Sequence, residues 1–106
     1  MVEVIWTEPA LNDLDAIADY IALYNSTAAR DLVQRMFNRM DQLIDHPDSG
    51  SKPVELRGWR YRRQIVEPPC RIFYRHEADA VYVLYVMRGE RKLWSRALAR
   101  RGKKAK

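Results

Sequence analysis

The stretch VEVIWTEPALNDLDAIADYI (Val2–Ile21) changes from strand-forming to helix-forming sequence within a few residues. β-Branched and aromatic residues dominate its first part, Val2–Trp6, and favour a short strand. Thr7 can cap a helix, Glu8 suits the positive end of the helix dipole, and proline at position 9 is tolerated in a first turn. The stretch therefore predicts a strand followed directly by a helix.

Two amphipathic helices are predicted in the first half of the chain. The first spans residues 8–24, with acidic residues between its apolar positions Leu11, Leu14, Ala18 and Ile21. After YNST, with Ser26 or Thr27 as the cap, a second apolar stripe runs through Ala29, Leu32, Val33, Met36, Met40 and Leu43. It should end near Asp45, because the residue before Pro47 disfavours helix. A short loop between two helices predicts an antiparallel hairpin.

Beyond Gly50 the apolar period falls from about 3.6 to 2, the period of strands. PVELRG, RYRRQIVE, CRIFYR and AVYVLYVM alternate in this way, and Pro68 and Pro69 should separate two of the strands. The segment Ala80–Met87 is apolar on both faces, which indicates a central strand. The sequence thus predicts an α+β fold, with an N-terminal strand and a helical hairpin packed on a mostly antiparallel sheet of three to four further strands.

Length and composition place the chain among small globular proteins. Its 106 residues fit a single domain, 1–106, of which about 99–106 should be a frayed basic tail. The chain has no apolar run long enough to span a membrane and no basic, apolar signal sequence, so we expect a cytoplasmic protein. Cys70 is the one cysteine, and no cluster of His or Cys predicts a metal site. No sequence motif implies a cofactor.

Charge is divided unequally along the chain. Residues 1–50 hold nine acidic and three basic residues, whereas residues 51–106 hold five acidic and sixteen basic ones. This division indicates that the second half meets a polyanion or an acidic partner. From Arg91 to Lys106 there are eight basic residues and no acidic one, although Leu93, Trp94, Ala97 and Leu98 could form a short helix.

Alternation along the strands separates the arginines from the predicted core. Ile65, Ile72, Tyr74, Leu84 and Val86 should face the helices. The opposite, open face should carry Arg60, Arg62, Arg71 and Arg75. Such a face could bind phosphates, but charged residues are also normal on the exposed face of any sheet.

The two histidines are weak candidates for proton transfer. His46 precedes a proline at the end of the second helix, and His76 falls in RHEAD, a predicted hairpin loop. Neither has a carboxylate partner that the sequence defines, and an arginine is a poor proton shuttle because its pKa lies above about 12. The sequence predicts no firm catalytic residue.

The segments VIWTEPALNDLDAIADYI, LIDHPDSG, ELRGWRYRRQIVEPPCRIFYR and VYVLYVMRGERKLWSR, in this order, resemble the RelE/ParE superfamily of toxins from bacterial type II toxin–antitoxin systems. The resemblance covers nearly the whole chain. It implies a growth-inhibiting toxin, active in stress responses and held in a hetero-oligomer by a cognate antitoxin. Antitoxins of this kind have an acidic, amphipathic segment that folds on binding, and a groove beside the helical hairpin is its natural seat. We expect it to cover part of the open face, at Arg60, Arg62, Arg71 and Arg75.

The superfamily divides by target into two branches. RelE-like toxins cut messenger RNA on the ribosome, and the resemblance would then place catalytic or phosphate-binding roles on Arg62, Arg71, Arg88 and Arg91. ParE-like toxins poison DNA gyrase. The late tyrosine of the nucleases is replaced here by Trp94 or Ser95, and no histidine substitutes for it.

The ParE-like ending also differs, because Arg88 stands where a histidine is frequent and Lys92 where an aspartate is common. The two long predicted helices of similar length, together with the missing acid–base residue, favour the gyrase hypothesis. The expected target contacts are then Arg88, Arg91, Lys92, Trp94 and Arg96. The messenger RNA endoribonuclease is the alternative. A plain nucleic-acid-binding module is a third hypothesis.

Overall fold

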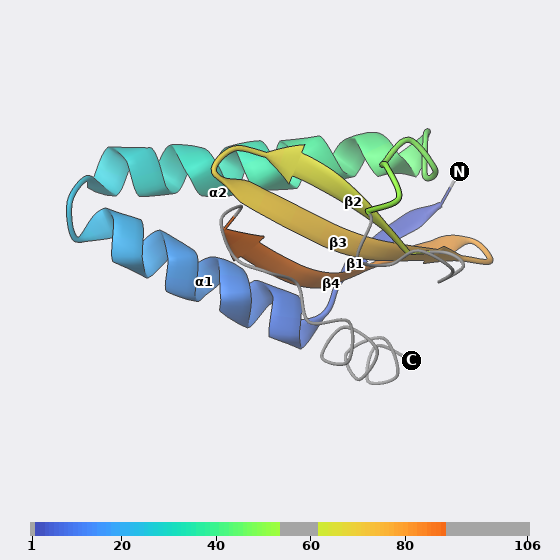
Figure 1. The fold of residues 1–106 in the computed structure, drawn as a ribbon, viewed down its shortest axis with the longest axis horizontal. Helices are drawn as coiled ribbons and strands as arrows, with labels where there is room; N and C mark the ends of the chain where they lie inside the picture. The colour runs from blue at the N-terminus through green and yellow to red at the C-terminus, as the bar shows by residue number, and fades with distance from the viewer. Residues whose placement is uncertain (1, 54–61, 89–106) are drawn as a thin grey trace.

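The computed structural model describes residues 2–53 and 62–88. Along the chain it has strand β1 (Glu3–Trp6), helices α1 (Glu8–Ala22) and α2 (Ser26–Asp41), a 3-10 turn η1 (Gln42–Ile44), and strands β2 (Arg62–Glu67), β3 (Cys70–Glu77) and β4 (Ala80–Arg88) (Figure 1). The strands lie in the order β1-β4-β3-β2. β1 pairs with β4 in parallel and the other pairs are antiparallel, which confirms the predicted α+β class with β4 as a central strand.

Thr7 forms the junction between β1 and α1. Its side-chain oxygen accepts the Ala10 N–H at 3.4 Å, as a helix cap does, and its hydroxyl donates to the Val83 carbonyl of β4 at 2.6 Å. Asn25, not Ser26 or Thr27, caps the second helix by accepting the Ala28 N–H at 3.0 Å. The helical hairpin was predicted, but the N-cap of α2 lies one residue before Ser26.

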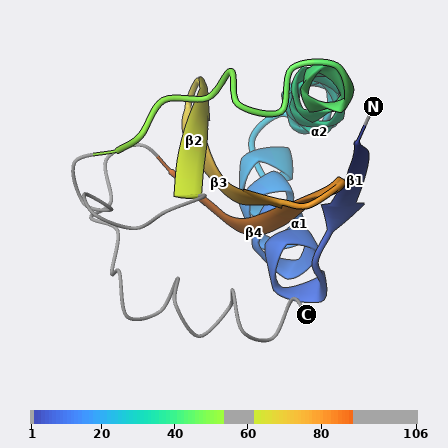
Figure 2. The same ribbon diagram turned by 90° about the vertical axis from the view of Figure 1, so that its right-hand side faces the viewer.

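The core lies between the two helices and one face of the sheet (Figure 2). Ile65, Ile72, Tyr74 and Val86 are buried there, as predicted. The prediction for Leu84 is wrong. Phe73 pairs with Tyr85 but Tyr74 pairs with Val83, so Leu84 is the extra residue of a β-bulge. The bulge interrupts the alternation along β4 and turns Leu84 to the other face of the sheet.

The face of the sheet away from the helices is therefore not an open polar surface. Phe73 and Leu84 are 0% exposed and Met87 is 4% exposed, and together they form a second apolar cluster. Tyr82 and Tyr85 pack against it. Strict alternation could not predict this cluster, because the bulge adds Leu84 to it.

Tyr74 ties the segment 45–51 to the sheet. Its hydroxyl accepts the Gly50 N–H at 3.0 Å and donates to the Pro47 carbonyl at 2.8 Å, while Arg63 donates to the Gly50 carbonyl at 2.9 Å. A Cβ on Gly50 would lie 2.6 Å from the Gln64 carbonyl oxygen and 2.7 Å from the Tyr74 hydroxyl. Only glycine fits at this close approach.

We expect Gly50→Ala to lower the free energy of unfolding by about 1–3 kcal/mol, because the added methyl group forces the backbones of two segments apart. Urea denaturation followed by circular dichroism measures the change. Ser49→Ala, at the exposed neighbouring position, is the control and should unfold like the unsubstituted chain. Equal stability of the Gly50→Ala variant would contradict the close approach.

Alkaline pH should weaken the attachment of the segment 45–51 to the sheet through Tyr74. Burial raises the pKa of the Tyr74 phenol above its ordinary value of 10.0, although the hydrogen bond from Gly50 lowers it in part. Above pH 10 the unfolded chain therefore releases this proton before the folded chain does, and the free energy of unfolding falls as pH rises. The Tyr74→Phe variant lacks the phenol, so its free energy of unfolding should fall less between pH 8 and about 11 than that of the unsubstituted chain. Thermal melting across this pH range measures the difference. An identical pH profile in both proteins would refute the assignment.

Candidate functional site

The register of β2 and β3 puts Arg62, Arg71 and Arg75, here called the basic sheet face, on the same face of the sheet. Arg62 lies directly opposite Arg75 across the β2–β3 pair. The expectation that Arg75 is exposed is wrong, because this residue is only 2% exposed. Its Nε lies 3.1 Å from a Glu77 oxygen, and its guanidinium stacks 4.6 Å from the centroid of the Tyr82 ring. An ion pair and a stack on an aromatic ring are two of the contacts that this buried arginine makes.

Arg71 has partners on the basic sheet face, and Arg62 is partly withdrawn from solvent there. Arg71 Nε donates to the Gln64 side chain at 2.8 Å, and the Arg71 guanidinium lies 4.8 Å from the centroid of the Phe73 ring. Arg62 is half-buried, and its pKa is lowered first by burial and then by the charge of Arg75. The basic sheet face is thus a packed layer of arginines and aromatic rings.

His76 has a carboxylate partner that the sequence did not reveal. The residue lies in β3 and not in the predicted loop, and its Nδ1 is 2.9 Å from an Asp48 oxygen. Arg63 Nε lies 3.5 Å from the same oxygen. Because neighbours alternate along β3, His76 points away from the face that carries Arg75. Within the described residues, no three His, Cys, Asp or Glu side chains are grouped to hold a metal ion.

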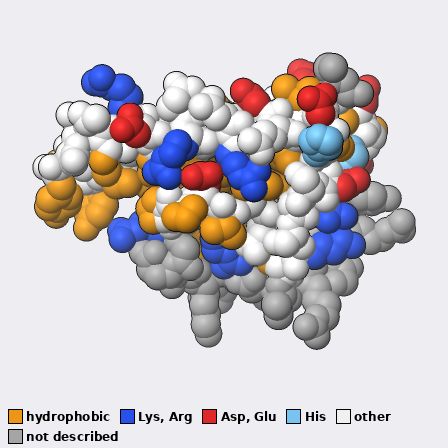
Figure 3. All heavy atoms as spheres, turned by 90° about the horizontal axis from the view of Figure 1, so that it is seen from above, with side chains coloured by type: hydrophobic (Ala, Val, Ile, Leu, Met, Phe, Trp, Pro, Cys, Tyr) orange, Lys and Arg blue, Asp and Glu red, His pale blue; other side chains and the backbone are white. Residues whose placement is uncertain are grey.

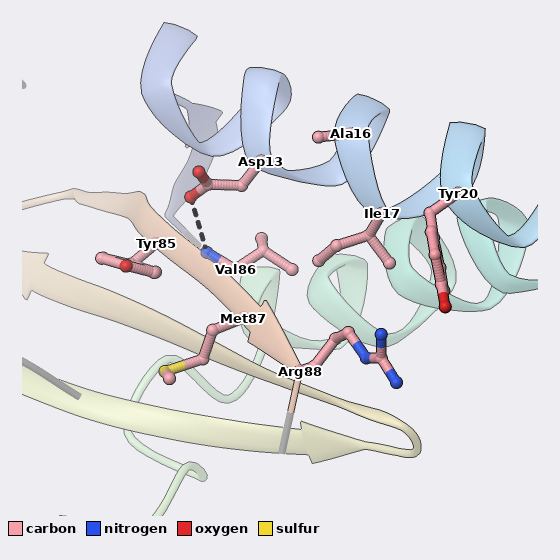
Figure 4. Close-up of a pocket in the computed structure, with 8 residues that line it drawn as sticks. All are labelled: Asp13, Ala16, Ile17, Tyr20, Tyr85, Val86, Met87 and Arg88. Carbon is pink, nitrogen blue, oxygen red and sulfur yellow. Dashed lines mark hydrogen bonds between the residues drawn. The ribbon is translucent and has the colours of Figure 1, made fainter. Parts of the chain in front are cut away.

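A pocket of about 400 Å³ lies between α1 and the last residues of β4, here called the α1–β4 pocket (Figure 4). Figure 4 shows Ile17 and Tyr20 on α1 facing the strand, with Arg88 at its end. β1 pairs only with Ala80–Val83, so α1 is the neighbour of the rest of β4 on that side. The lining residues are Asp13, Ala16, Ile17, Tyr20, Tyr85, Val86, Met87 and Arg88.

Two polar contacts define the geometry of the α1–β4 pocket. An Asp13 oxygen accepts the Val86 N–H at 3.1 Å, which joins the helix to the strand. Arg88 is exposed, and its guanidinium lies 5.3 Å from the centroid of the Tyr20 ring. The sequence indicated Arg88 and, by resemblance, a groove beside the hairpin, but not the residues that line this pocket. The spacing of Asp13, Ala16, Ile17 and Tyr20 (i, i+3, i+4, i+7) was the signal for a second face of α1.

Exposed apolar side chains continue from the α1–β4 pocket to the tip of the hairpin. Tyr20 is 50% exposed, Leu23 78% and Tyr24 79%. The rings of Tyr20 and Tyr24 meet edge to face at 5.7 Å. Seen from above the hairpin, hydrophobic side chains gather at this end of the molecule, whereas positive and negative ones alternate along its middle (Figure 3). The tip and the pocket form one apolar region.

The remaining predicted site residues, Arg60, Arg91, Lys92, Trp94 and Arg96, lie outside the described residues. The short helix and the frayed tail predicted near the C-terminus lie there too, as does most of PVELRG.

Replacing Arg75 should destabilise the fold, since the side chain is buried in an ion pair and a ring stack. We expect Arg75→Ala to cost about 1–3 kcal/mol in the free energy of unfolding, measured in urea. Arg30→Ala, at an exposed position of α2, should change it by less than about 0.5 kcal/mol. A neutral Arg75→Ala substitution would show that this arginine is a surface residue, as the sequence first indicated.

Comparisons with known proteins agree with the observed fold and identify the family of the chain. The family model of the ParE toxin of the type II toxin–antitoxin system parDE matches residues 4–93. Toxin RelE2 of Caulobacter vibrioides is 32% identical over 91 residues, which cover 86% of this chain and 99% of that toxin. A chain of the chromosomal ParDE system of P. aeruginosa superimposes with a TM-score of 0.69 at 26% identity, covering 85% of this chain and 98% of the other. The chain therefore belongs to the ParE toxin family, within the RelE/ParE superfamily of type II toxin–antitoxin toxins.

Proposed function

We propose that this toxin inhibits growth by poisoning DNA gyrase and that a cognate antitoxin neutralises it. The observation that carries the choice of target is the engagement of Arg71, one of the arginines that the nuclease hypothesis would use, by Gln64 and Phe73. A nuclease has to offer its cations to the phosphates of RNA. Here Arg75 is engaged by Glu77 and Tyr82, and Arg71 by Gln64 and Phe73.

Proton transfer gives a second argument against RNA cleavage on the basic sheet face. A nuclease of this kind needs a group that titrates near neutral pH within reach of the reacting hydroxyl. His76 is the described histidine nearest to these arginines in the sequence, but it is paired with Asp48 and points to the opposite face. A gyrase poison needs only a binding surface, and this requirement agrees better with the arrangement.

Arg88 is the target contact that we propose among the described residues. It is exposed at the end of β4, and the other proposed contacts, Arg91, Lys92, Trp94 and Arg96, follow it directly in the sequence. An exposed arginine beside an aromatic ring is typical of binding hot spots.

Ribosome-dependent cleavage of messenger RNA is the second candidate function. The grouping of Arg62, Arg71 and Arg75 on one sheet face favours it, as does the name of the 32% identical relative, Toxin RelE2. In either case we propose that the protein acts in the cytoplasm. None of the described helices is long and apolar enough to cross a membrane.

Purified toxin should be incubated with gyrase and supercoiled plasmid, and separately with translating ribosomes and a reporter message. We expect cleaved plasmid trapped on gyrase and an intact message. Arg88→Ala should reduce the trapped product about tenfold or more through the loss of a contact residue. Arg30→Ala, which changes the same charge on α2, is the control. Cuts in the message with unaffected gyrase would establish the alternative.

A further inference from the structure

Strand β1 forms one edge of the sheet, and its outer side is open. The strands lie in the order β1-β4-β3-β2, and Figure 2 shows β1 at the margin of the sheet. The N–H groups of Glu3 and Thr7 donate toward β4 at 3.0 Å and 3.3 Å, so alternation turns the backbone N–H and C=O groups of Val4 and Trp6 away from β4. In the described part of the chain, these outward groups have no hydrogen-bond partner. Such an edge accepts another extended strand.

The opposite edge of the sheet is protected by the chain itself. Ser51 and Gln64 of β2 exchange backbone hydrogen bonds at 3.0 Å and 2.8 Å, which covers the outer side of β2 at its middle. Other proteins protect their edge strands with lysine, proline or a bulge. The stretch Val4–Trp6 contains neither lysine nor proline, and all of it is uncharged and only partly buried. Of the two edges, β1 is therefore the one that is ready for a further strand.

Two neighbouring features limit the length of this open edge. Val2 donates its N–H to the Ile44 carbonyl at 3.2 Å, so the outer side of the chain is already covered just before β1. Helix α1 begins at Glu8, so the extended conformation ends there. A partner strand therefore has to match a short edge whose outward groups belong to Val4 and Trp6.

An antiparallel copy of β1 matches this edge in one register. When Ile5 lies on a two-fold axis, Val4 of each copy faces Trp6 of the other, and each such pair exchanges both of its N–H···O bonds. An axis through Val4 instead sets Trp6 against Val2, whose N–H is already used. An axis through Trp6 sets Val4 against the first turn of α1. The edge is thus complementary to itself with Ile5 at the centre.

The side chains agree with this register. Val4 and Trp6 pack against the core on the helix side, and alternation places Ile5 on the other face of the sheet. Two Ile5 side chains then meet at the axis as a non-hydrogen-bonded pair, in which side chains approach most closely. The exposed Glu3 faces Thr7 of the other copy, so like charges do not oppose each other along the strand pair. An uncharged edge favours an equally uncharged strand, and β1 is one.

We infer that two copies of this toxin associate through their β1 strands, with Ile5 on the two-fold axis, so that one sheet continues across both copies. The inference goes beyond the proposed function and does not depend on gyrase. β1 pairs with Ala80–Val83, so this interface lies beside the first half of β4, whereas the α1–β4 pocket lies beside the second half.

Sedimentation velocity of the purified toxin over a range of concentrations tests the inference. Ile5→Lys brings two like charges together on the axis and should raise the dissociation constant of the dimer about tenfold or more. Val66→Lys is the matched control, because Val66 is a 54% exposed β-branched residue on β2, at the opposite edge. It should leave the dissociation constant unchanged. Ile5→Glu should weaken the dimer alone, and mixing it with Ile5→Lys should restore association, because opposite charges then meet on the axis.

An unsubstituted toxin that stays monomeric at every concentration, or a dimer that Ile5→Lys does not weaken, would overturn the inference. Equal weakening by Val66→Lys would do the same, since the effect would then come from net charge. A mixture of Ile5→Lys and Ile5→Glu that remains monomeric would show that the axis does not pass through Ile5.

Amide hydrogen exchange followed by NMR gives a test without any substitution. The N–H groups of Val4 and Trp6 should exchange severalfold more slowly in the dimer than in dilute, monomeric toxin, whereas exchange at Val66 should not change. Equal exchange at Val4 and Trp6 in both samples would contradict the pairing of β1 strands. Protection of Val4 and Trp6 only after the neighbouring gene product is added would make an antitoxin strand the occupant, and the inference of a second copy would be wrong.

Discussion

The side chain of Thr7 holds together the two halves of this fold. Its hydroxyl donates to the Val83 carbonyl, and its oxygen accepts the Ala10 N–H, so one residue ends β1 against β4 and begins α1. The chain turns away from the sheet at this point, and α1 becomes the neighbour of the second half of β4. Asp13 then fixes the helix to the strand through the Val86 N–H. The α1–β4 pocket and the position of Arg88 both follow from this junction.

Local chemistry in the sequence predicted most of the elements. The cap at Thr7, the proline after it and the change of apolar period beyond Gly50 located both helices and the later strands within a few residues. Pro68 and Pro69 occupy the turn between β2 and β3, as their missing N–H groups required. These features depend on residues that are neighbours in the sequence, so they can be predicted from one sequence alone.

Features that depend on distant contacts were not predictable in the same way. The bulge at Leu84 arises from the pairing of β3 with β4, and it reassigns one large apolar residue to the other face. Alternation places Arg75 opposite the core and therefore predicted it to be exposed, yet it is 2% exposed and contacts the Tyr82 ring and a Glu77 carboxylate. The α1–β4 pocket is formed by two elements far apart in the sequence. Only the residues on α1 show a recognisable helical spacing in the sequence.

The arginines of this toxin thus lie in two different surroundings. On one face, arginines and rings pack into a stable layer, while at the end of β4 an arginine remains exposed beside an apolar pocket. We propose that DNA gyrase contacts this end of β4. Size-exclusion chromatography of gyrase with the unsubstituted toxin and with Arg88→Ala tests the proposal most directly. Co-elution of the unsubstituted toxin with gyrase and its loss in Arg88→Ala are predicted, and equal co-elution of both variants would contradict the proposal.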